Sequence, residues 1–404
     1  MNKVSVIFIS ILIFLVFLAP TSIFIPNPTT NGHIKNLIYL FLLIYTSPDF
    51  VKIFIKKYRK YNILLIAYCL VIIFSVYYNI DTISRYAGNY LTEEGELNLE
   101  GIHSIKDTLY SCIGLFTSCL YVQRISAHKE ARTFLQTLFW LLLLVIIPTN
   151  FDALLKPAEE GDAAKYIVGN KFTVGYYNLY LCFLYYFLHP CLNRIWQKIT
   201  LFLLIVMMFV VCYHNRCGTM TIASLAFMYL ALLSSNHIRY YLYTGKTIIV
   251  LLLIVDIGFF LLVSWLLQYD FFQYMITTVL GKDLTITGRT EIFVDIQQAF
   301  SISPWVGFGY GNSQVISKYF TEANDAQNGL IDMYIQIGFL GVLVFILMIH
   351  HISKIIEKQK TGNPIFAFIF TIIIISSVEI PFKFVFIFFL SFSFIRKMPS
   401  CQKK

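Results

Sequence analysis

An arginine stands in a very short connection between two apolar runs of this sequence. The stretch YHNRCGTMTIASL, residues 213–225, holds Arg216, although a hairpin between two membrane spans needs only small polar residues. The helix that follows would present free N–H groups and its positive dipole end beside this arginine, and a guanidinium pairs with phosphate through two hydrogen bonds. Arg216 is therefore a candidate anion ligand. The alternative is an interfacial arginine whose side chain reaches the lipid headgroups.

A second arginine opens a predicted helix in the longest polar connection. In TGRTEIFVDIQQAF, Thr287 is a candidate N-cap and Glu291 falls in the first turn, where the helix dipole favours a carboxylate. One face of the helix is apolar, which suits a membrane interface; it comprises Ile292, Phe293, Ile296, Ala299 and Phe300. Arg289 and Arg216 together would clamp a pyrophosphate. Taken alone, Arg289 fits a solvated loop residue better.

Aromatic, glycine and amide residues follow. In SPWVGFGYG, residues 303–311, a proline and three glycines allow tight turns. Trp305 and Tyr310 are candidates for stacking on a sugar, and an aromatic belt at the interface is the alternative. The chain then returns to the membrane through NDAQNGLIDMYIQIGFLG, where Asn324 or Asp325 can cap the helix.

Other polar residues stand near or within apolar runs. His214 is either a base or an interfacial imidazole. Asp256, near the middle of a span, is a functional candidate by default, and a hydrogen-bonded packing residue is the alternative. Asp332 could support a site at the same face, while Glu379 and Lys383 could simply pair with each other.

These residues must be positioned by membrane helices. The chain has 404 residues, of which 58% are hydrophobic and 13% charged, whereas soluble domains carry about 25% charge. Apolar runs close to the length that crosses a bilayer, about 20 residues, predict an all-α polytopic membrane protein with about twelve spans. They are 4–25, 36–55, 61–79, 106–124, 133–150, 171–189, 197–213, 217–234, 246–267, 325–350, 363–379 and 381–396. Residues 364–395 could also form one helix, but Glu379-Ile380-Pro381 favours a turn.

Lysine and arginine are concentrated in every second loop, and this pattern predicts the orientation of the chain in the membrane. Every second loop is basic, beginning with the cluster around Lys52 and the loop after Arg124, which predicts cytoplasmic termini. The net charge of +9 is explained by these anchors and indicates no nucleic-acid partner. Residues 1–404 form one membrane-embedded domain with one large extracytoplasmic loop, 268–324, before the tenth span. The first span has no small-residue cleavage site, so we expect a retained helix.

Residues 169–341 resemble the O-antigen ligase and polymerase family. The resemblance rests on TGRTEIFVDIQQAFSISPWVGFGYG with NDAQNGLIDMYIQIGFLG, on NRCGTMTIASL as the Ser-x-x-Arg-Thr helix start, and on GNKFTVGYYNLYLCFLYY as the Gly-rich stretch entering a span. It implies a membrane glycosyltransferase of type-C-like fold in the bacterial plasma membrane, using a polyprenyl-diphosphate-linked donor. It also implies that Arg216 and Arg289 hold the diphosphate, that Asn178 matches the family asparagine, and that Gln327-Asn328 matches a His-Asn pair.

Glutamine in place of histidine is the main departure from the family. Because Gln327 cannot act as a general base at neutral pH, it would orient a hydroxyl, with Asp325 and Glu291 as candidate bases. Lys171, His214, Trp305 and Tyr310 join Asn178 and Asn328 as candidate substrate-binding residues.

We therefore expect a polymerase of lipid-linked oligosaccharide repeat units for O-antigen, capsule or exopolysaccharide. A ligase of the same family is the first alternative, and a lipid-linked sugar flippase or transporter the second. No metal or other cofactor is expected. Besides the donor and acceptor, the expected partners are membrane lipid, a flippase and a chain-length regulator.

Overall fold

A computed structural model describes residues 2–19, 28–86, 104–126, 130–156, 166–233, 242–266, 269–274, 289–321, 323, 325–359 and 363–395, with the backbone alone for 28–29, 262–264, 266, 289–291, 359 and 363. Within these ranges the chain is helical and contains no strand. The main helices are α1 (Lys3–Phe17), α3 (Pro28–Thr46), α4 (Lys56–Tyr78), α6 (Ile105–Ile125), α7 (Glu130–Leu155), α8 (Lys171–Leu188), α9 (Ile195–His214), α10 (Gly218–Met228), α12 (Gly245–Leu252), α13 (Phe259–Leu266), α18 (Gly329–Gln359), α19 (Asn363–Ser376) and α20 (Phe384–Leu390).

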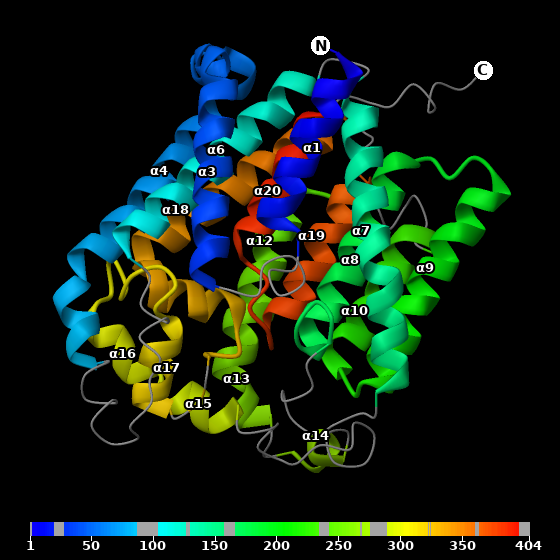
Figure 1. The fold of residues 1–404 in the computed structure, drawn as a ribbon. Coiled ribbons are helices and arrows are strands. Elements are labelled where there is room, and N and C mark those ends of the chain that lie inside the picture. Colours follow the sequence, from blue (N-terminus) through cyan, green and yellow to red (C-terminus); the bar gives the residue numbers. More distant parts are fainter. Residues whose placement is uncertain are drawn as a thin grey trace.

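Shorter segments extend or connect these helices. They are η1 (Ser47–Ile53), η3 (Tyr229–Leu233), η4 (Leu253–Gly258), α14 (Asp270–Tyr274), α15 (Arg289–Asp295), α16 (Gln297–Ile302), α17 (Ser313–Thr321) and η6 (Ser391–Phe394). The long helices run side by side, and α14–α17 lie together at one end of the bundle, which we call the loop end (lower in Figure 1).

Each predicted span overlaps a helix or a run of helices. Five helices in the described part are long and apolar enough to cross a membrane: Thr30–Ile53, Lys56–Tyr78, Glu130–Leu155, Ile195–His214 and Gly329–Lys358. The protein is thus an all-α membrane protein by length and composition of its helices. That the shorter helices also cross stays a prediction. The turn expected near Pro381 is confirmed, because α19 ends at Ser376 and α20 begins at Phe384.

The core is a continuous apolar cluster between the helices. α4 and α12 pack along α18, and α8 packs between α7 and α9. A second, smaller cluster lies under α15–α17 and includes Phe293, Ile296, Phe308 and Ile335.

The apolar face of the 289–302 segment belongs to this second cluster. Ile292, Phe293, Ile296 and Ala299 are all buried, with Phe260 of α13 against Phe293. The apolar face, which the sequence suggested for a membrane interface, is thus buried within the protein. The helical period of apolar residues indicates a face that needs covering, and here the protein itself covers it.

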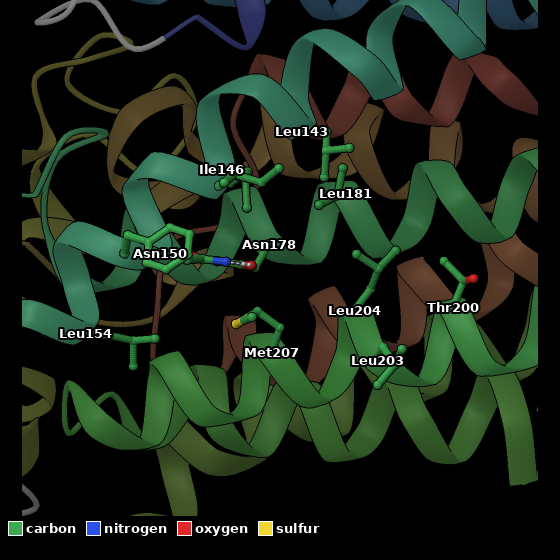
Figure 2. A pocket seen from close by; sticks show the side chains of 12 residues that line it. Leu143, Ile146, Asn150, Leu154, Asn178, Leu181, Thr200, Leu203, Leu204 and Met207 are labelled. Carbon is green, nitrogen blue, oxygen red and sulfur yellow. Dashed lines mark hydrogen bonds between the residues drawn. The ribbon is translucent and has the colours of Figure 1, made fainter.

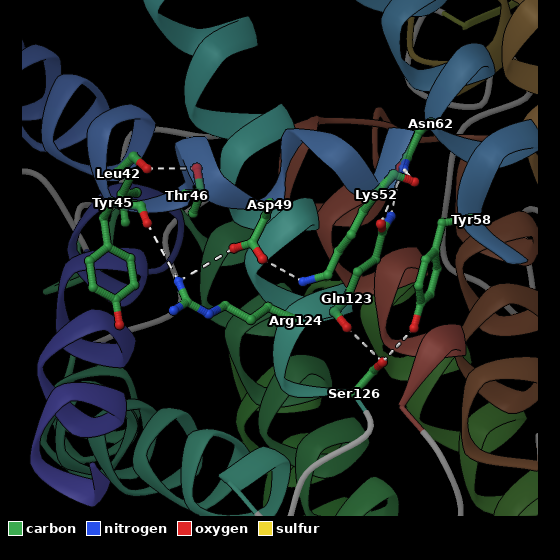
Figure 3. A network of polar contacts seen from close by, with 10 residues as sticks. All are labelled: Leu42, Tyr45, Thr46, Asp49, Lys52, Tyr58, Asn62, Gln123, Arg124 and Ser126. Carbon is green, nitrogen blue, oxygen red and sulfur yellow. Dashed lines mark hydrogen bonds and ion pairs between the residues drawn. The ribbon is translucent and has the colours of Figure 1, made fainter. Parts of the chain in front are cut away.

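Polar contacts join α3, α4 and α6 at the end opposite the loop end. Asp49 is only 7% exposed. Its two oxygens pair with Lys52 (2.5 Å) and Arg124 (3.4 Å), as Figure 3 shows. A buried charge needs such partners. Two basic loops predicted to lie on the same side therefore share one carboxylate.

Candidate functional site

A polar cavity of about 370 Å³ lies where the start of α18 meets α4, the segment after Tyr310 and the turn before α20. Its lining includes Tyr68, Tyr310, Gly311, Ser313, Gln314, Asp325, Asp332, Gln336, Phe382 and Lys383. The lining combines carboxylates, amides and an ammonium with aromatic rings. This composition contrasts with the apolar core of the bundle and is typical of a ligand site.

A break in α18 shapes the cavity. Gly338 has φ 61° and ψ −168°, which interrupts the helix between residues 337 and 339. The segment 304–309 docks at this break through four backbone hydrogen bonds. The amides of Phe308 and Gly309 donate to the carbonyls of Ile335 and Gln336, and the amides of Phe339 and Leu340 donate to the carbonyls of Pro304 and Trp305.

Two glycines allow this approach of backbone to backbone. A Cβ on Gly307 would lie 2.6 Å from the carbonyl carbon of Gln336, and a Cβ on Gly338 would overlap the backbone of Trp305 and Val306. Asn79, which directly follows α4, donates a hydrogen bond from its side-chain amide to the Gly307 carbonyl (2.8 Å). The glycines of the sequence motif thus fix the loop that forms one wall of the cavity.

A chain of hydrogen bonds runs along that wall. The Gly311 amide donates to Gln336 Oε1 (2.8 Å), and Gln336 Nε2 donates to Asp332 Oδ2 (2.5 Å). Asp332 is 1% exposed, and its Oδ1 has no hydrogen-bond partner. Ser313, Asp325 and Lys383 lie close enough to interact with the Asp332 carboxylate, but the Ser313 hydroxyl does not reach hydrogen-bonding geometry with Oδ1.

The turn that leads into α18 carries three of the expected residues. Asp325 lines the cavity, and its Oδ1 accepts the amide of Gln327 (3.0 Å). Gln327 itself has φ 47°, a left-handed conformation uncommon for any residue but glycine. Asn328 is fully buried; its Oδ1 accepts the amides of Leu330 and Ile331, and it therefore caps α18.

Arg216 occupies a strained position in the α9–α10 connection. Its φ is 51°, and its amide donates to the carbonyl of Tyr213 while the Cys217 amide donates to that of Cys212. These two bonds form a Schellman motif, in which glycine usually holds the position that Arg216 holds here. The Arg216 side chain is exposed.

Contacts on both sides hold this connection in place. The Tyr166 hydroxyl donates to Asn215 Oδ1 (3.0 Å), and His214 Nε2 donates to the Lys156 carbonyl (3.3 Å). His214 thus contacts backbone at the end of α7, in keeping with its interfacial interpretation.

Arg216 does not line the cavity. The Tyr176 hydroxyl of α8 lies within electrostatic reach of Cys217 in the α9–α10 connection and of Asp325 in the cavity wall.

Asn178 lies elsewhere, in a separate apolar groove of about 250 Å³ between α7, α8 and α9. It exchanges two hydrogen bonds with Asn150 (2.8 and 2.9 Å), and Figure 2 shows the pair among leucine, isoleucine and methionine side chains. Both amides are buried and paired, so in this arrangement they join α7 to α8.

The remaining expected residues are distributed as follows. Lys171 begins α8, with its ammonium near the Phe172 ring. Trp305 is 62% exposed and packs edge-on against Phe339, away from the cavity. Tyr310 lines the cavity and stacks on Phe384 (4.8 Å). Burial raises the pKa of Tyr310, so its phenol stays protonated and can donate a hydrogen bond. Arg289 begins α15, but its side chain and that of Glu291 lie outside the described part.

Asp256 makes contacts between helices. Its Oδ2 accepts the Ser376 hydroxyl (2.9 Å), its backbone carbonyl accepts Asn328 Nδ2 (3.1 Å), and its Oδ1 has no hydrogen-bond partner. The buried residue joins η4 to the end of α19 and the start of α18.

Sequence reasoning missed Gln336, Gln314 and Tyr68. A usable signal existed for Gln336, because residues four apart share one face of a helix and Asp332 and Gln336 are the polar pair on the first turns of α18. Tyr68 lies in an unbroken apolar run and gave no signal.

The cavity offers hydrogen-bond donors and acceptors and a carboxylate at the end of a polar wall, and an exposed arginine lies at the same end of the bundle. No group of three or more metal-ligating side chains occurs among the residues described. In comparisons with known proteins, no family model, curated protein or solved structure matches this chain.

Proposed function

We propose that this protein polymerises lipid-linked oligosaccharide repeat units at the outer face of the bacterial plasma membrane. In this proposal both termini are cytoplasmic and the loop end faces outward. The product is O-antigen, capsule or exopolysaccharide.

One observation carries the proposal. A polar cavity with two carboxylates and an ammonium lies at the loop end of an otherwise apolar bundle, and the strained arginine of the α9–α10 connection lies at the same end. Strained backbone at a polar site indicates function, because the fold must stabilise it elsewhere. Of the three non-glycine residues with positive φ in the described chain, Arg216 and Gln327 are at this end.

The reaction requires positioning and charge stabilisation. A hydroxyl oxygen of one lipid-linked chain attacks the anomeric carbon of the sugar at the diphosphate of another. The new glycosidic C–O bond forms as the C–O bond to diphosphate breaks, polyprenyl diphosphate leaves with the bonding electrons, and the hydroxyl proton passes to a base. Asp325, in the cavity wall, accepts that proton in our proposal.

The cationic groups have a separate role. Diphosphate is already a good leaving group, so stabilising its developing charge and aligning the two substrates account for most of the acceleration. Arg216 and Arg289 bind the diphosphate, and Gln327 orients the attacking hydroxyl.

The ligase alternative differs only in the acceptor. A flippase would need polar groups along a central path through the spans. Asp256 is instead bonded to Ser376 and does not line the cavity, which favours chemistry at one face.

Deletion of the protein distinguishes the polymerase, ligase and flippase functions. A polymerase-null cell displays single repeat units on their usual acceptor and loses long chains. Absence of any repeat on the acceptor, with lipid-linked polymer accumulating, would support the ligase; lipid-linked single units trapped on the cytoplasmic side would support the flippase.

Complementation then tests the base. Asp325→Asn should polymerise roughly 10²–10⁴ times more slowly than wild type, because the amide cannot take up the proton. Asp270→Asn, which alters an exposed carboxylate of α14 at the same end, is the matched control and should restore full ladders. Chain-length distributions on gels at matched expression give the answer.

A further inference from the structure

We propose that the cavity binds the neutral sugar of the acceptor, with Asp332 Oδ1 accepting a hydrogen bond from a sugar hydroxyl; this rests on the proposed function and names the substrate part that the cavity takes. Asp332 is a positioning residue here, and Gln336 fixes its orientation.

The first reason is an unsatisfied acceptor. Asp332 is one of the residues that line the cavity and is 1% exposed; its Oδ2 is bonded to Gln336, and its Oδ1 has no hydrogen-bond partner. A buried carboxylate oxygen without a donor is costly, so native structures rarely retain one without a reason. A ligand hydroxyl in the cavity would supply the missing donor.

The second reason is that the carboxylate is held rigidly. The Gly311 amide fixes Gln336, Gln336 fixes Asp332, and the 304–309 segment that precedes Gly311 is bonded to the α18 break. A preorganised acceptor loses little entropy when a ligand binds.

The third reason is the charge of the wall. Two carboxylates, Asp325 and Asp332, face one ammonium, Lys383, so the cavity disfavours a diphosphate. Lys383 in turn disfavours a cation beside Asp332. A neutral polyol matches the carboxylates and the amides of Gln314 and Gln336, while its C–H faces can pack on Tyr310 and Phe382. The volume, about 370 Å³, falls within the usual range of small-molecule sites, roughly 300–1,000 Å³.

The test measures binding rather than turnover. Ser313→Cys places a thiol in the cavity wall, and peptide mass spectrometry follows its alkylation by N-ethylmaleimide in the purified full-length protein. The probes are oligosaccharides released by mild acid from the surface polysaccharide of the producing cells, and a panel of free hexoses and N-acetylhexosamines. We expect at least one saccharide to slow alkylation at position 313, and sodium pyrophosphate not to.

Asp332→Asn should raise the half-protecting saccharide concentration about ten- to hundredfold, because the remaining oxygen stays with Gln336 and an amide donor replaces the charged acceptor. Asp256→Asn removes an equally buried carboxylate outside the cavity and should leave protection unchanged. Gln336→Met, which frees the Asp332 side chain, should weaken protection by a smaller factor. Size-exclusion profiles confirm that each variant is folded.

Protection by pyrophosphate or by Na⁺ alone would overturn the proposal, as would saccharide protection that is equal in Asp332→Asn and Asp256→Asn, or no saccharide protection at all. These outcomes are separate from the deletion experiment. Saccharide protection that depends on Asp332 in a protein whose deletion leaves long chains intact would refute the polymerase and keep the sugar site.

Discussion

At position 216 the backbone conformation favours glycine, whereas the sequence has an arginine. A left-handed residue with a Cβ costs roughly 1–2 kcal/mol, and glycine would remove most of that cost. The chain nevertheless has arginine at φ 51°, with its side chain exposed at the loop end. We infer that the side chain, rather than the turn, is the reason for this residue.

This inference makes Arg216→Gly the most informative substitution. It should leave the thermal midpoint unchanged or higher and nearly abolish long chains, because the strain and the proposed diphosphate ligand disappear together. Loss of a hydrogen bond to a charged group costs about 1.5–3 kcal/mol, which is roughly a ten- to hundredfold loss of turnover. Arg216→Lys should recover part of the loss, since an ammonium keeps the charge without the two-pronged geometry.

Arg194→Ala is the matched control, because Arg194 is the exposed arginine at the opposite end of α9. It should polymerise normally, as judged by ladders at matched expression. Normal ladders from a well-expressed Arg216→Gly protein would instead mean that the arginine only anchors the connection to headgroups.

Among the elements, α18 matters most, because it is two helices held end to end by a loop. The 304–309 segment supplies amides to the carbonyls that end the first half and carbonyls to the amides that begin the second. Backbone groups freed by the break are therefore paired, as they must be in a nonpolar environment.

Alanine at the break tests this arrangement. Gly338→Ala would place a Cβ against the backbone of Trp305 and Val306, and backbone cannot move aside as a side chain can. Adding the positive-φ strain to ordinary overpacking, we expect a loss of stability of about 2–5 kcal/mol, with loss of long chains. Gly307→Ala should act in the same way from the other side of the contact.

Gly32→Ala serves as the control for both, since nothing lies within 4 Å of the added methyl group in α3. The thermal midpoint of detergent-purified protein is the measurement. A Gly338→Ala protein as stable as Gly32→Ala would show that the loop does not dock at the break.

The sequence predicts the helices well and the break poorly, for physical reasons. Long apolar runs require helices in lipid, and Pro381 separates the last two. Gly338 lies within an apolar run in which a glycine is tolerated, and only a distant loop decides that the helix opens there. The period of the 289–302 segment likewise indicates an apolar face without saying that Phe260 and Phe308 cover it.

At the scale of the molecule, the two ends of the bundle differ in kind. The loop end carries the polar cavity and α14–α17, whereas the opposite end carries the Asp49 ion pairs with Lys52 and Arg124. The alternation of basic loops predicts that the latter end is cytoplasmic.

Labelling in intact cells tests this orientation. A cysteine at Ser313 should react with an impermeant maleimide, and one at Lys354 should not, because the two lie toward opposite ends of the bundle and both positions are at least partly accessible. Opposite labelling would place the cavity in the cytoplasm and exclude the outward-facing reaction.

The sequence singles out some of the residues that line the cavity. Asp325 and Tyr310 line the cavity, and Arg216 lies at the same end outside it. The sequence places residues along helices and at their ends, but it does not say which helix faces which. Tyr68 lines the cavity because α4 packs on α18. Asn178 does not line it, because its side chain on α8 is bonded to Asn150 of α7.

The break in α18 also limits the length of continuous helix that is left to cross the bilayer. From Gly338 to Lys354, the first lysine at the other end, the helix rises roughly 24 Å at about 1.5 Å per residue, some 6 Å less than the hydrocarbon thickness of a typical bilayer, roughly 30 Å. Trp305 and Phe339 stand exposed at the level of the break, where aromatic side chains favour the boundary between acyl chains and headgroups. The bilayer beside this face would therefore be locally thinner, so that its boundary lies at the level of Trp305 and Phe339. In the proposed reaction, a sugar would reach the cavity through a depression in the membrane surface, without crossing acyl chains.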